Sequence, residues 1–384
     1  MMTKVQAWLG QPRYQVAIAA LLVVAIVAWF YGGKFGGEIT GFFRIGSVLP
    51  LSPFLDPASS KIYAGELGYD GQQFLTLAFD PALAHPESIA ALDSPPYRYR
   101  RILYPLLGYG LGLGQPTWIP YALVAVNAIA LVALVWIISR YGAAWGEPRL
   151  GLLALALPGL WITLAFSTAD ILSTLWVAIA LLAYRAQHRG GLAIALALAG
   201  LTRETTLVVW LALLLAWGRD GLRSGTGTSW RLLPAFGIAL LPIGLWNGYV
   251  LLRFAGQGSY GAASNFGPPL VGFGQKLAAL ATLPLPKAGL EALAFFTLLA
   301  AWGTILLAAW RWPQSRDAVA IAALLYTLPL VSSSLIILGY FLDYLRVYLD
   351  LFVLLLLAQI PRPLKLLPVA AASLLSAAFI LAHS

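Results

Sequence analysis

The stretch Leu207-Val-Val-Trp-Leu-Ala-Leu-Leu-Leu-Ala-Trp217 decides the fold class, because it is apolar on every side of a helix or a strand. Residues 351–358 repeat this pattern, and the whole chain is 60% hydrophobic with only 10% charged residues. A soluble core cannot bury so much apolar surface, since ordinary globular chains carry about a quarter of charged residues. Strands of a transmembrane barrel would alternate apolar and polar residues. The sequence therefore predicts an all-α polytopic membrane protein.

Apolar runs separated by charged segments recur along all 384 residues. This pattern predicts one integral membrane domain, 1–384, with about eleven transmembrane helices. The expected spans are 16–31, 118–138, 150–166, 170–184, 191–201, 205–217, 232–251, 290–310, 318–338, 344–359 and 364–381.

Basic residues set the orientation of these spans. With the N-terminus in the cytoplasm, the inner segments carry thirteen Lys and Arg against three acids, as the positive-inside rule requires. The first span follows Lys4 and Arg13 and is expected to be a retained signal anchor, because no small-residue cleavage site follows it. The net charge of +9 thus belongs to a face that meets anionic membrane lipids, and no nucleic-acid partner is expected.

Two long outer loops follow from this topology, 32–117 and 252–289. The first holds seven acidic residues, and the second is rich in Gly, Pro and Ala and is expected to be mobile enough to cover a site. Within the first loop, 102–113 is apolar but is broken by Pro105 and three glycines. A full crossing there would reverse every later loop, so we expect short membrane-skimming or re-entrant helices.

The usage of cysteine and histidine excludes several kinds of site. The chain has no Cys, which excludes disulfides, thiolate nucleophiles and Cys-ligated metals. The three His are scattered, so a zinc or haem site is not expected. An acyltransferase is disfavoured, because no His lies in an apolar span beside an acid. A divalent metal held by carboxylates stays open.

Asp70 is the first candidate for chemistry. Residues 67–81 predict a short helix that stops at Pro81, with Leu67, Phe74 and Asp70 on its membrane-facing side. A partly desolvated carboxylate at the membrane boundary would have a raised proton affinity and would serve as a general base, and the neighbouring Gly71 would let a substrate approach the backbone. The alternative is a solvated Asp that favours a helix N-terminus.

Three arginines follow in Tyr97-Arg-Tyr-Arg-Arg-Ile-Leu-Tyr-Pro105. Guanidinium groups bind phosphate through two parallel hydrogen bonds, and tyrosines favour the headgroup level of a membrane, so this pattern suits a lipid-linked phosphate. The alternative is an interfacial anchor that holds lipids without specificity.

Three further groups lie at outer helix ends. The motif Ser167-Thr-Ala-Asp170 matches a capping box, which favours a structural role. Arg203 and Glu204 interrupt two apolar runs, so they form either a functional site or a mutual ion pair that caps the turn. Asp343 and Arg346, one helical turn apart, form either an ion pair or a phosphate contact.

The segments Tyr69-Asp-Gly-Gln72, Phe79-Asp-Pro81 and 97–105 together resemble the first-loop signature of bacterial polytopic membrane proteins implicated in cell-surface glycopolymer formation. More broadly, the order of elements resembles the GT-C superfamily, which includes protein O-mannosyltransferases, lipid A aminoarabinose transferases and GPI mannosyltransferases. The resemblance implies a GT-C-like fold in the bacterial inner membrane, with a periplasmic active site.

By that resemblance, the enzyme transfers a sugar from a polyprenyl-phosphate donor to a cell-surface glycan or lipid acceptor, with inversion. Asp70 matches the first-loop catalytic acid that deprotonates the acceptor hydroxyl, Asp170 matches a second acid, and Arg203 resembles the basic residue of an outer turn. Many members have paired acids at the first position, whereas Gly71 follows Asp70 here. This departure favours a mechanism without metal, and no other cofactor is expected.

The residues expected to bind substrate share a place in the outer loops or at outer helix ends. They are Tyr69, Gln72, Asp80, Arg98, Arg100, Arg101, Asp170, Arg203, Glu204, Tyr260, Asp343 and Arg346.

Three rival functions remain open. A transporter or flippase of lipid-linked sugars would need charged residues deep in the spans and broken helices, and the sequence has no symmetric pair of Gly- or Pro-broken spans. A glycopolymer polymerase or ligase would have a similar outer site, and a purely structural membrane subunit would show no turnover.

Overall fold

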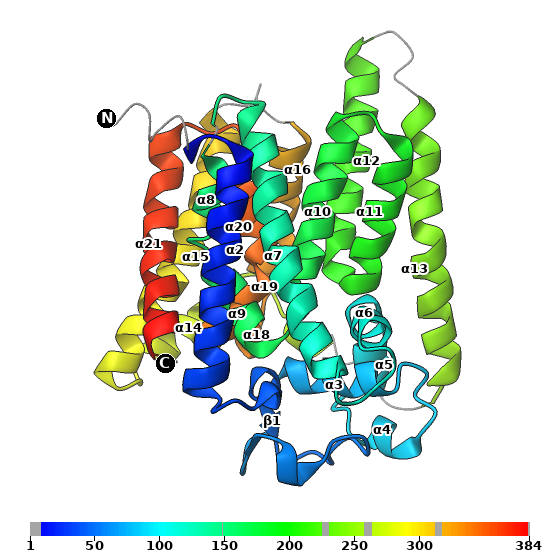
Figure 1. Cartoon of the computed structure of the whole chain (residues 1–384). Helices are drawn as coiled ribbons and strands as arrows, with labels where there is room; N and C mark the ends of the chain where they lie inside the picture. The colour runs from blue at the N-terminus through cyan, green and yellow to red at the C-terminus, as the bar shows by residue number, and fades with distance from the viewer. Residues whose placement is uncertain (1–8, 148, 225–229, 257–262, 312–316, 383–384) are drawn as a thin grey trace.

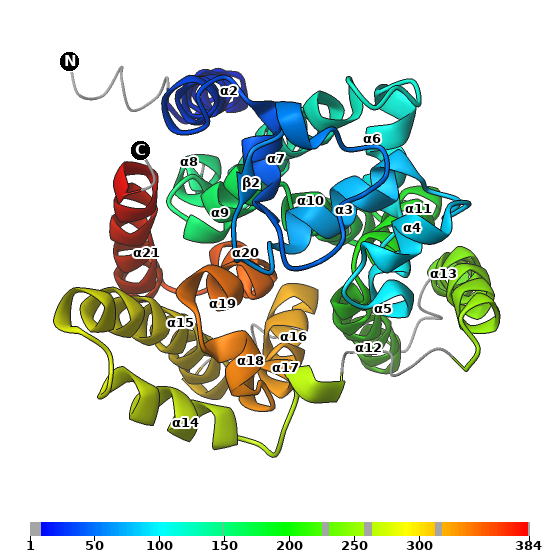
Figure 2. The same cartoon turned by 90° about the horizontal axis from the view of Figure 1, so that it is seen from below.

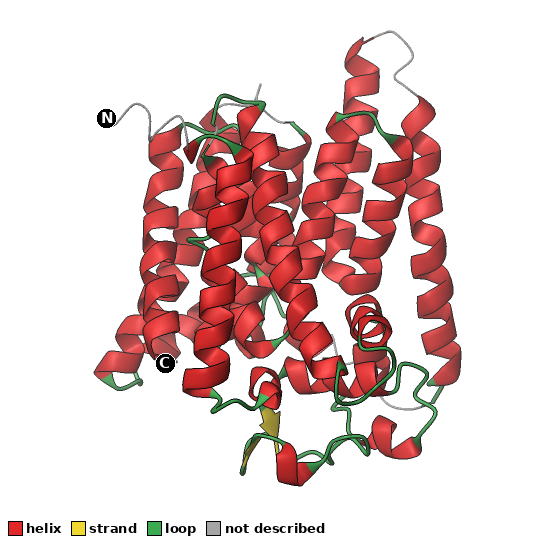
Figure 3. Ribbon diagram, viewed as in Figure 1, coloured by secondary structure: helices red, strands yellow, loops and turns green. Residues whose placement is uncertain are grey.

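The computed structural model describes residues 9–147, 149–224, 230–256, 263–311 and 317–382. Most of this chain is helical (Figure 3). The one strand pair in these ranges is parallel, with Ile45 of β1 (Ile45–Gly46) opposite Ile62 of β2 (Ile62–Tyr63). The all-α class predicted from the sequence is therefore confirmed.

Within the described ranges, six helices are long and apolar enough to cross a membrane. They are α2 (Pro12–Trp29), which a π-helical turn η1 (Phe30–Lys34) extends, α7 (Ile119–Ala143), α12 (Leu207–Ser224), α13 (Leu233–Arg253), α15 (Leu285–Arg311) and α21 (Arg362–Ala382). Their outer faces expose large apolar side chains such as Leu21, Ile129 and Leu245, as contact with lipid requires. These helices fit a multi-pass membrane protein; eleven spans are not reproduced at full length.

The other five predicted spans form shorter or broken helices. Residues 170–184 and 191–201 become α10 (Asp170–Arg185) and α11 (Arg189–Thr202). Residues 150–166 split into α8 (Leu150–Ala154) and α9 (Pro158–Phe166), because Leu157 is extended before Pro158, as residues before proline are. Residues 318–338 and 344–359 split into α16 (Ala318–Leu325), α17 (Thr327–Val331), α18 (Leu335–Leu338), α19 (Phe341–Val347) and α20 (Leu349–Leu357).

Short helices occupy the centre of the bundle, and long helices surround them. Every residue of α20 is buried, and it packs on α10, α15 and α16. Seen along the bundle, α10 and α20 lie inside a ring that includes α2, α13, α15 and α21 (Figure 2). Broken segments are tolerated there because neighbouring protein, not lipid, covers their backbone.

The first loop folds over the end of the bundle opposite the N-terminus (Figure 1). It contains η2 (Ile39–Phe43), η3 (Pro57–Ser59), α3 (Asp70–Phe79), α4 (Pro86–Ala90), α5 (Pro95–Tyr99) and α6 (Leu103–Leu111). With 9 residues, α6 is about 14 Å long and cannot cross a hydrocarbon layer of about 30 Å. It packs on α3 and α7, where Asn127 donates to the hydroxyl of Tyr104 at 2.9 Å.

The segment predicted as the second outer loop, 252–289, contains η6 (Ala263–Asn265) and α14 (Val271–Leu280). Lys276 of α14 is 1% exposed, and its Nζ lies 2.6 Å from Oε2 of Glu291 and 3.0 Å from the carbonyl oxygen of Gly339. Glu291 also accepts a hydrogen bond from the backbone N–H of Phe341. This buried ion pair ties α14 and α15 to the start of α19. The remaining elements are the short turns η4 (Glu204–Thr206) and η5 (Trp230–Leu232).

Candidate active site

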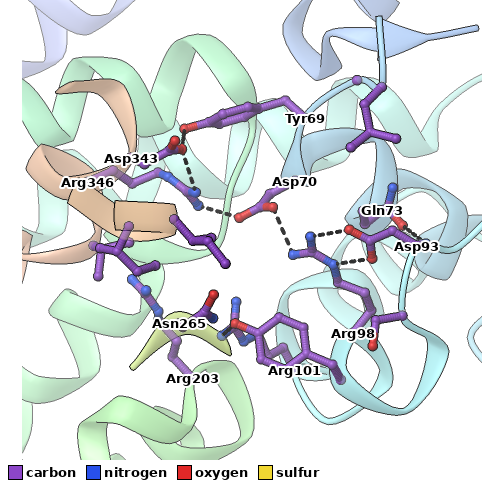
Figure 4. A pocket seen from close by; sticks show the side chains of 17 residues that line it. Tyr69, Asp70, Gln73, Asp93, Arg98, Arg101, Arg203, Asn265, Asp343 and Arg346 are labelled. Atoms are coloured by element: carbon purple, nitrogen blue, oxygen red, sulfur yellow. Dashed lines mark hydrogen bonds and ion pairs between the residues drawn. The ribbon is translucent and has the colours of Figure 1, made fainter. Parts of the chain in front are cut away.

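Asp70 begins α3 and lies between two arginines. Its Oδ1 is 2.8 Å from Nη1 of Arg98, and its Oδ2 is 2.7 Å from Nη1 of Arg346 (Figure 4). The helix itself begins and ends close to the predicted limits, since it stops before Pro81. Phe74, expected on a membrane-facing side, is instead buried against Tyr104, and Leu67 lies before the helix and is exposed. Asp70 is thus held at the junction of the first loop and α19.

Arg346 contacts carboxylates from three parts of the chain. Besides Asp70, its Nη1 lies 3.1 Å from Oδ2 of Asp170, and its Nη2 lies 3.6 Å from Oδ1 of Asp343. Its guanidinium also stacks 4.9 Å from the centre of the Tyr69 ring. The side chain is 6% exposed, so these acids offset the cost of burying its charge.

The predicted capping box at Asp170 is wrong. Ala169 is the N-cap of α10 and makes no side-chain capping bond. Asp170 instead pairs with Arg203 and Arg346, and the hydroxyl of Thr168 donates to it at 2.6 Å. A carboxylate engaged by two buried guanidinium groups is part of the charged network and is not a local cap.

Arg203 and Glu204 do not pair with one another as the capping alternative requires. Arg203 pairs with Asp170, whereas Glu204 accepts two hydrogen bonds from Arg101, at 2.6 and 2.9 Å. Arg101 also donates to the hydroxyl of Tyr97 and lies 4.4 Å from the centre of its ring. The turn between α11 and α12 therefore joins the first loop to the network.

The proton affinity of Asp70 differs from the sequence-based expectation. Burial raises its pKa, but the nearby Arg98, Arg346 and Arg101 outweigh burial and hold the pKa well below its ordinary value. The raised proton affinity predicted from the sequence is therefore wrong. In this arrangement Asp70 is ionised at any physiological pH.

Asp343 has a different environment. The hydroxyl of Tyr69 donates to its Oδ1 at 2.6 Å, and its contact with Arg346 is longer than that of Asp70. Burial raises the pKa of Asp343 above its ordinary value, although Arg346 and the hydrogen bond from Tyr69 act in the opposite direction. The two carboxylates therefore differ in the direction in which the fold shifts their pKa.

These side chains line a polar cavity of about 440 Å³. Its described lining residues include four arginines and three carboxylates, and Asp170 and Glu204 behind the wall balance the remaining positive charge; the charged lining residues are Arg98, Arg101, Arg203, Arg346, Asp70, Asp93 and Asp343. Asp170 and Glu204 hold the arginines without lining the cavity. The cavity is therefore suited to an anion that can form several hydrogen bonds.

A second, apolar cavity of about 240 Å³ adjoins the first. Its wall includes Val208, Phe266 and Pro329, and it shares Tyr97, Arg101, Arg203, Asn265, Ile337 and Val347 with the polar cavity. Two of the shared side chains are cationic. A molecule with a charged head and an apolar tail would meet suitable surfaces on the two sides of Arg101 and Arg203.

Gly71 does not face substrate as the sequence suggested. A Cβ atom there would lie 2.2 Å from the carbonyl oxygen of Phe166 and 3.0 Å from Cα of Phe43. The space beside Gly71 is thus taken by the last residue of α9, Phe166, which packs against the first turn of α3.

Four residues expected in the site lie elsewhere or outside the described ranges. Gln72 is buried and accepts a hydrogen bond from the backbone N–H of Gly46 at 2.9 Å. Asp80 accepts from the backbone N–H groups of Ala84 and His85, so it caps the turn after α3. Arg100 stacks over Tyr97 and is not among the lining residues of either cavity, and Tyr260 lies outside the described residues.

The sequence analysis missed Asp93, Tyr97 and Asn265 as lining residues. Asp93 accepts two hydrogen bonds from Arg98, at 2.6 and 2.8 Å, and a carboxylate five residues before an arginine was the available signal. For Asn265 the sequence carries no such signal, because only the packing of η6 beside α18 brings this residue to the cavity.

Metal dependence stays a prediction. Across the ranges that the structure describes, no group of three or more His, Asp or Glu side chains is arranged to hold a metal ion. The carboxylates of the site contact guanidinium groups. The chain matches no family model, and comparison with curated proteins and with solved structures gave no match.

Proposed function

We propose that the chain is a glycosyltransferase of the GT-C type that moves a sugar from a polyprenyl-phosphate carrier to a cell-surface glycan or lipid acceptor on the outer face of a bacterial inner membrane. One observation carries this proposal: a polar cavity and an apolar cavity share a wall that contains Arg101 and Arg203. A lipid-linked sugar phosphate has an apolar chain, an anion and a polar sugar in that order.

Recognition of the phosphate is proposed for the arginines. Guanidinium groups bind the oxygens of a phosphodiester through paired hydrogen bonds, and four of them line the polar cavity. Each guanidinium is already oriented by a carboxylate, as Arg101 is by Glu204 at 2.6 Å and Arg98 by Asp93 at 2.6 Å. Groups held in place before binding lose little freedom when the anion arrives, and they stabilise charge that develops on a leaving phosphate.

The apolar cavity is proposed to take the first isoprene units. Its wall comes from α12, α17 and the residues after α16, and it includes Val208, Tyr326 and Tyr348. With the lipid placed there, the sugar projects into the polar cavity beside Asp70. The permanently ionised Asp70 would then stabilise positive charge at the anomeric carbon, as a carboxylate does in other sugar transfers.

Broken helices favour a second candidate, a transporter or flippase of lipid-linked sugars. The breaks before Pro158 and at Tyr348 are of the kind that transporters use near a binding site. The distribution of charge favours the transferase, because Asp70 and Arg98 of the first loop meet Arg346 where this loop packs on α19. A polymerase or ligase would use the same cavities with two lipid-linked substrates.

The test uses the full-length protein in lipid nanodiscs. Undecaprenyl phosphates linked to radiolabelled glucose, mannose, galactose or arabinose are incubated with a cell-envelope extract as acceptor. We expect label in the acceptor and free undecaprenyl phosphate with one of these donors. Asp70→Asn should lower the rate by about 10² or more, whereas Asp56→Asn, a matched change at an exposed acid that lines neither cavity, should not.

One outcome would contradict the role of Asp70, and another would contradict the transferase. Turnover by Asp70→Asn at the rate of the unaltered protein would remove Asp70 from the reaction. In proteoliposomes, movement of the intact donor across the bilayer without cleavage of its sugar–phosphate bond would favour the flippase.

A further inference from the structure

The polar cavity contains a second carboxylate, Asp343, that the arginines restrain much less than they restrain Asp70. Asp70 has guanidinium nitrogens at 2.7 and 2.8 Å, one on each oxygen. The contact of Asp343 with Arg346 is 3.6 Å long, and both this contact and the hydrogen bond from Tyr69 use Oδ1. The closest contact of each partner is thus with the same oxygen, Oδ1, and the side chain, which is 26% exposed, lies in the cavity wall (Figure 4).

The elements packed around Asp343 bring few other charges to it. By their sequences, α9 and α18 contain no titratable residue. Glu291 of α15 is neutralised by Lys276 of α14, and Asp350 of α20 accepts hydrogen bonds from Thr174 and Tyr326. The groups that face Asp343 are therefore Tyr69, Asp70 and Arg346, together with Tyr340 at the start of its own helix.

We propose that Asp343, oriented by Tyr69, is the group that accepts the proton of the acceptor hydroxyl in the proposed glycosyl transfer. This inference rests on the proposed function. The acceptor oxygen forms a bond to the anomeric carbon of the sugar while the bond from that carbon to the phosphate oxygen breaks. The bonding electrons leave with the phosphate, which becomes a dianion beside the arginines, and the acceptor proton moves to Oδ2 of Asp343. Asp343 later releases this proton to water through the cavity.

Two features of the geometry suit Asp343 to this step. A base must take a proton in the transition state, and a carboxylate clamped by two guanidinium groups does this poorly. The Tyr69 hydroxyl donates to Oδ1 at 2.6 Å, which fixes the orientation of this carboxylate in the cavity wall. The opposite pKa shifts of Asp70 and Asp343 agree with this division, since paired carboxylates in different environments commonly take different roles.

Arg346 links the two carboxylates. It lies between Asp70 and Asp343, and an incoming phosphate would compete for its guanidinium. Movement of Arg346 toward the phosphate would weaken its 3.6 Å contact with Asp343 further, so that donor binding would increase the basicity of Asp343 just before the acceptor reacts. A positioning role for Tyr69 follows from the same contact.

The experiment measures the pH dependence of transfer with the panel of four undecaprenyl-phosphate sugars in nanodiscs. We expect the unaltered protein to lose kcat/KM at acid pH as one group becomes protonated. Asp343→Asn should lower kcat by about 10² to 10⁴, with donor KM changed less than tenfold. It should also abolish the fall in kcat/KM at acid pH, the acid limb of the profile. Asp70→Asn should be slow but should retain the limb, and Asp343→Glu should recover part of the rate.

Two further variants separate catalysis from packing. Formate should restore Asp343→Ala by at least tenfold, because a small carboxylate can enter the vacated space and accept the proton. Tyr69→Phe should shift the acid limb without abolishing it. A purely structural role would give variants that formate does not rescue.

Each result decides between the two proposals. If Asp343→Asn keeps its acid limb or loses less than threefold in kcat while the unaltered protein turns over, the assignment of Asp343 is wrong and the proposed function stands. If the unaltered protein turns over none of the four donors, both fail.

Discussion

Arg346 of α19 lies 2.7 Å from Asp70 of α3, although the two residues come from opposite ends of the chain. This contact joins the first loop to the centre of the bundle, since α19 packs on α9 and α15. The site therefore depends on the packing of α19 as much as on the motif around Asp70.

The stability of the protein in acid should depend on Asp70. The folded state lowers the pKa of Asp70 below its unfolded value of about 3.9, so its contribution to stability is fully present above about pH 5. It is lost as the pH falls through the folded pKa. We expect the stability difference between the unaltered protein and Asp70→Asn to shrink below about pH 4 in thermal unfolding in detergent. A difference independent of pH would contradict the ion-paired state, and Glu87→Gln, at an exposed acid, serves as control.

Gly71→Ala should disturb the site without removing any of its charges. The added methyl group would lie 2.2 Å from the carbonyl oxygen of Phe166, so α3 or α9 must shift. We expect a loss of about 1 to 3 kcal/mol in the free energy of unfolding, together with reduced transfer. Gly110→Ala is the control, because a Cβ atom there meets no atom within 4 Å. Equal stability of the two variants would show that the approach of Phe166 is not tight.

The buried pair Lys276–Glu291 should behave as a unit. Both side chains are 1% exposed, so Lys276→Met leaves a buried carboxylate without its cation and should cost about 3 to 5 kcal/mol. The double variant Lys276→Met with Glu291→Gln should be more stable than Lys276→Met alone, which a double-mutant cycle measures by chemical unfolding. Additive losses would show that the two residues do not interact.

The two ends of the bundle should differ in accessibility from outside the cell. The chain has no Cys, so single cysteines can be introduced without a background. We expect Ala58→Cys, in the first loop, to react with an impermeant thiol reagent in intact cells, and Ala144→Cys, after α7, to react only after permeabilisation. Both positions are exposed, so the reverse pattern would invert the predicted topology.

Local features of the sequence predicted local features of the structure. The apolar runs predicted helices, and Pro81 correctly ended the helix that begins at Asp70. Arginines interleaved with tyrosines indicate a phosphate site at 98–101, Arg203 interrupts two apolar runs, and Asp343 and Arg346 are one helical turn apart. The structure brings most of these residues together around one cavity.

The sequence does not predict which of these charged residues pair with one another. Arg203 and Glu204 are neighbours in sequence, yet each takes its partner from another element, Asp170 and Arg101 respectively. The lowered pKa of Asp70 follows from that packing, because Arg346 reaches it only through the fold. The break between α19 and α20 was missed for a related reason, since no proline or glycine marks it and only the backbone of Tyr348 departs from the helix.

Arg101 and Arg203 line both cavities, and this restricts how the substrate selectivity of the protein can be altered. A substitution that changes the shape of one cavity at these arginines also moves their positive charge in the other cavity. Selectivity for the lipid tail and selectivity for the charged head group would then change together. To alter selectivity for the tail alone, substitutions should be made at Val208 or Phe266, which line only the apolar cavity.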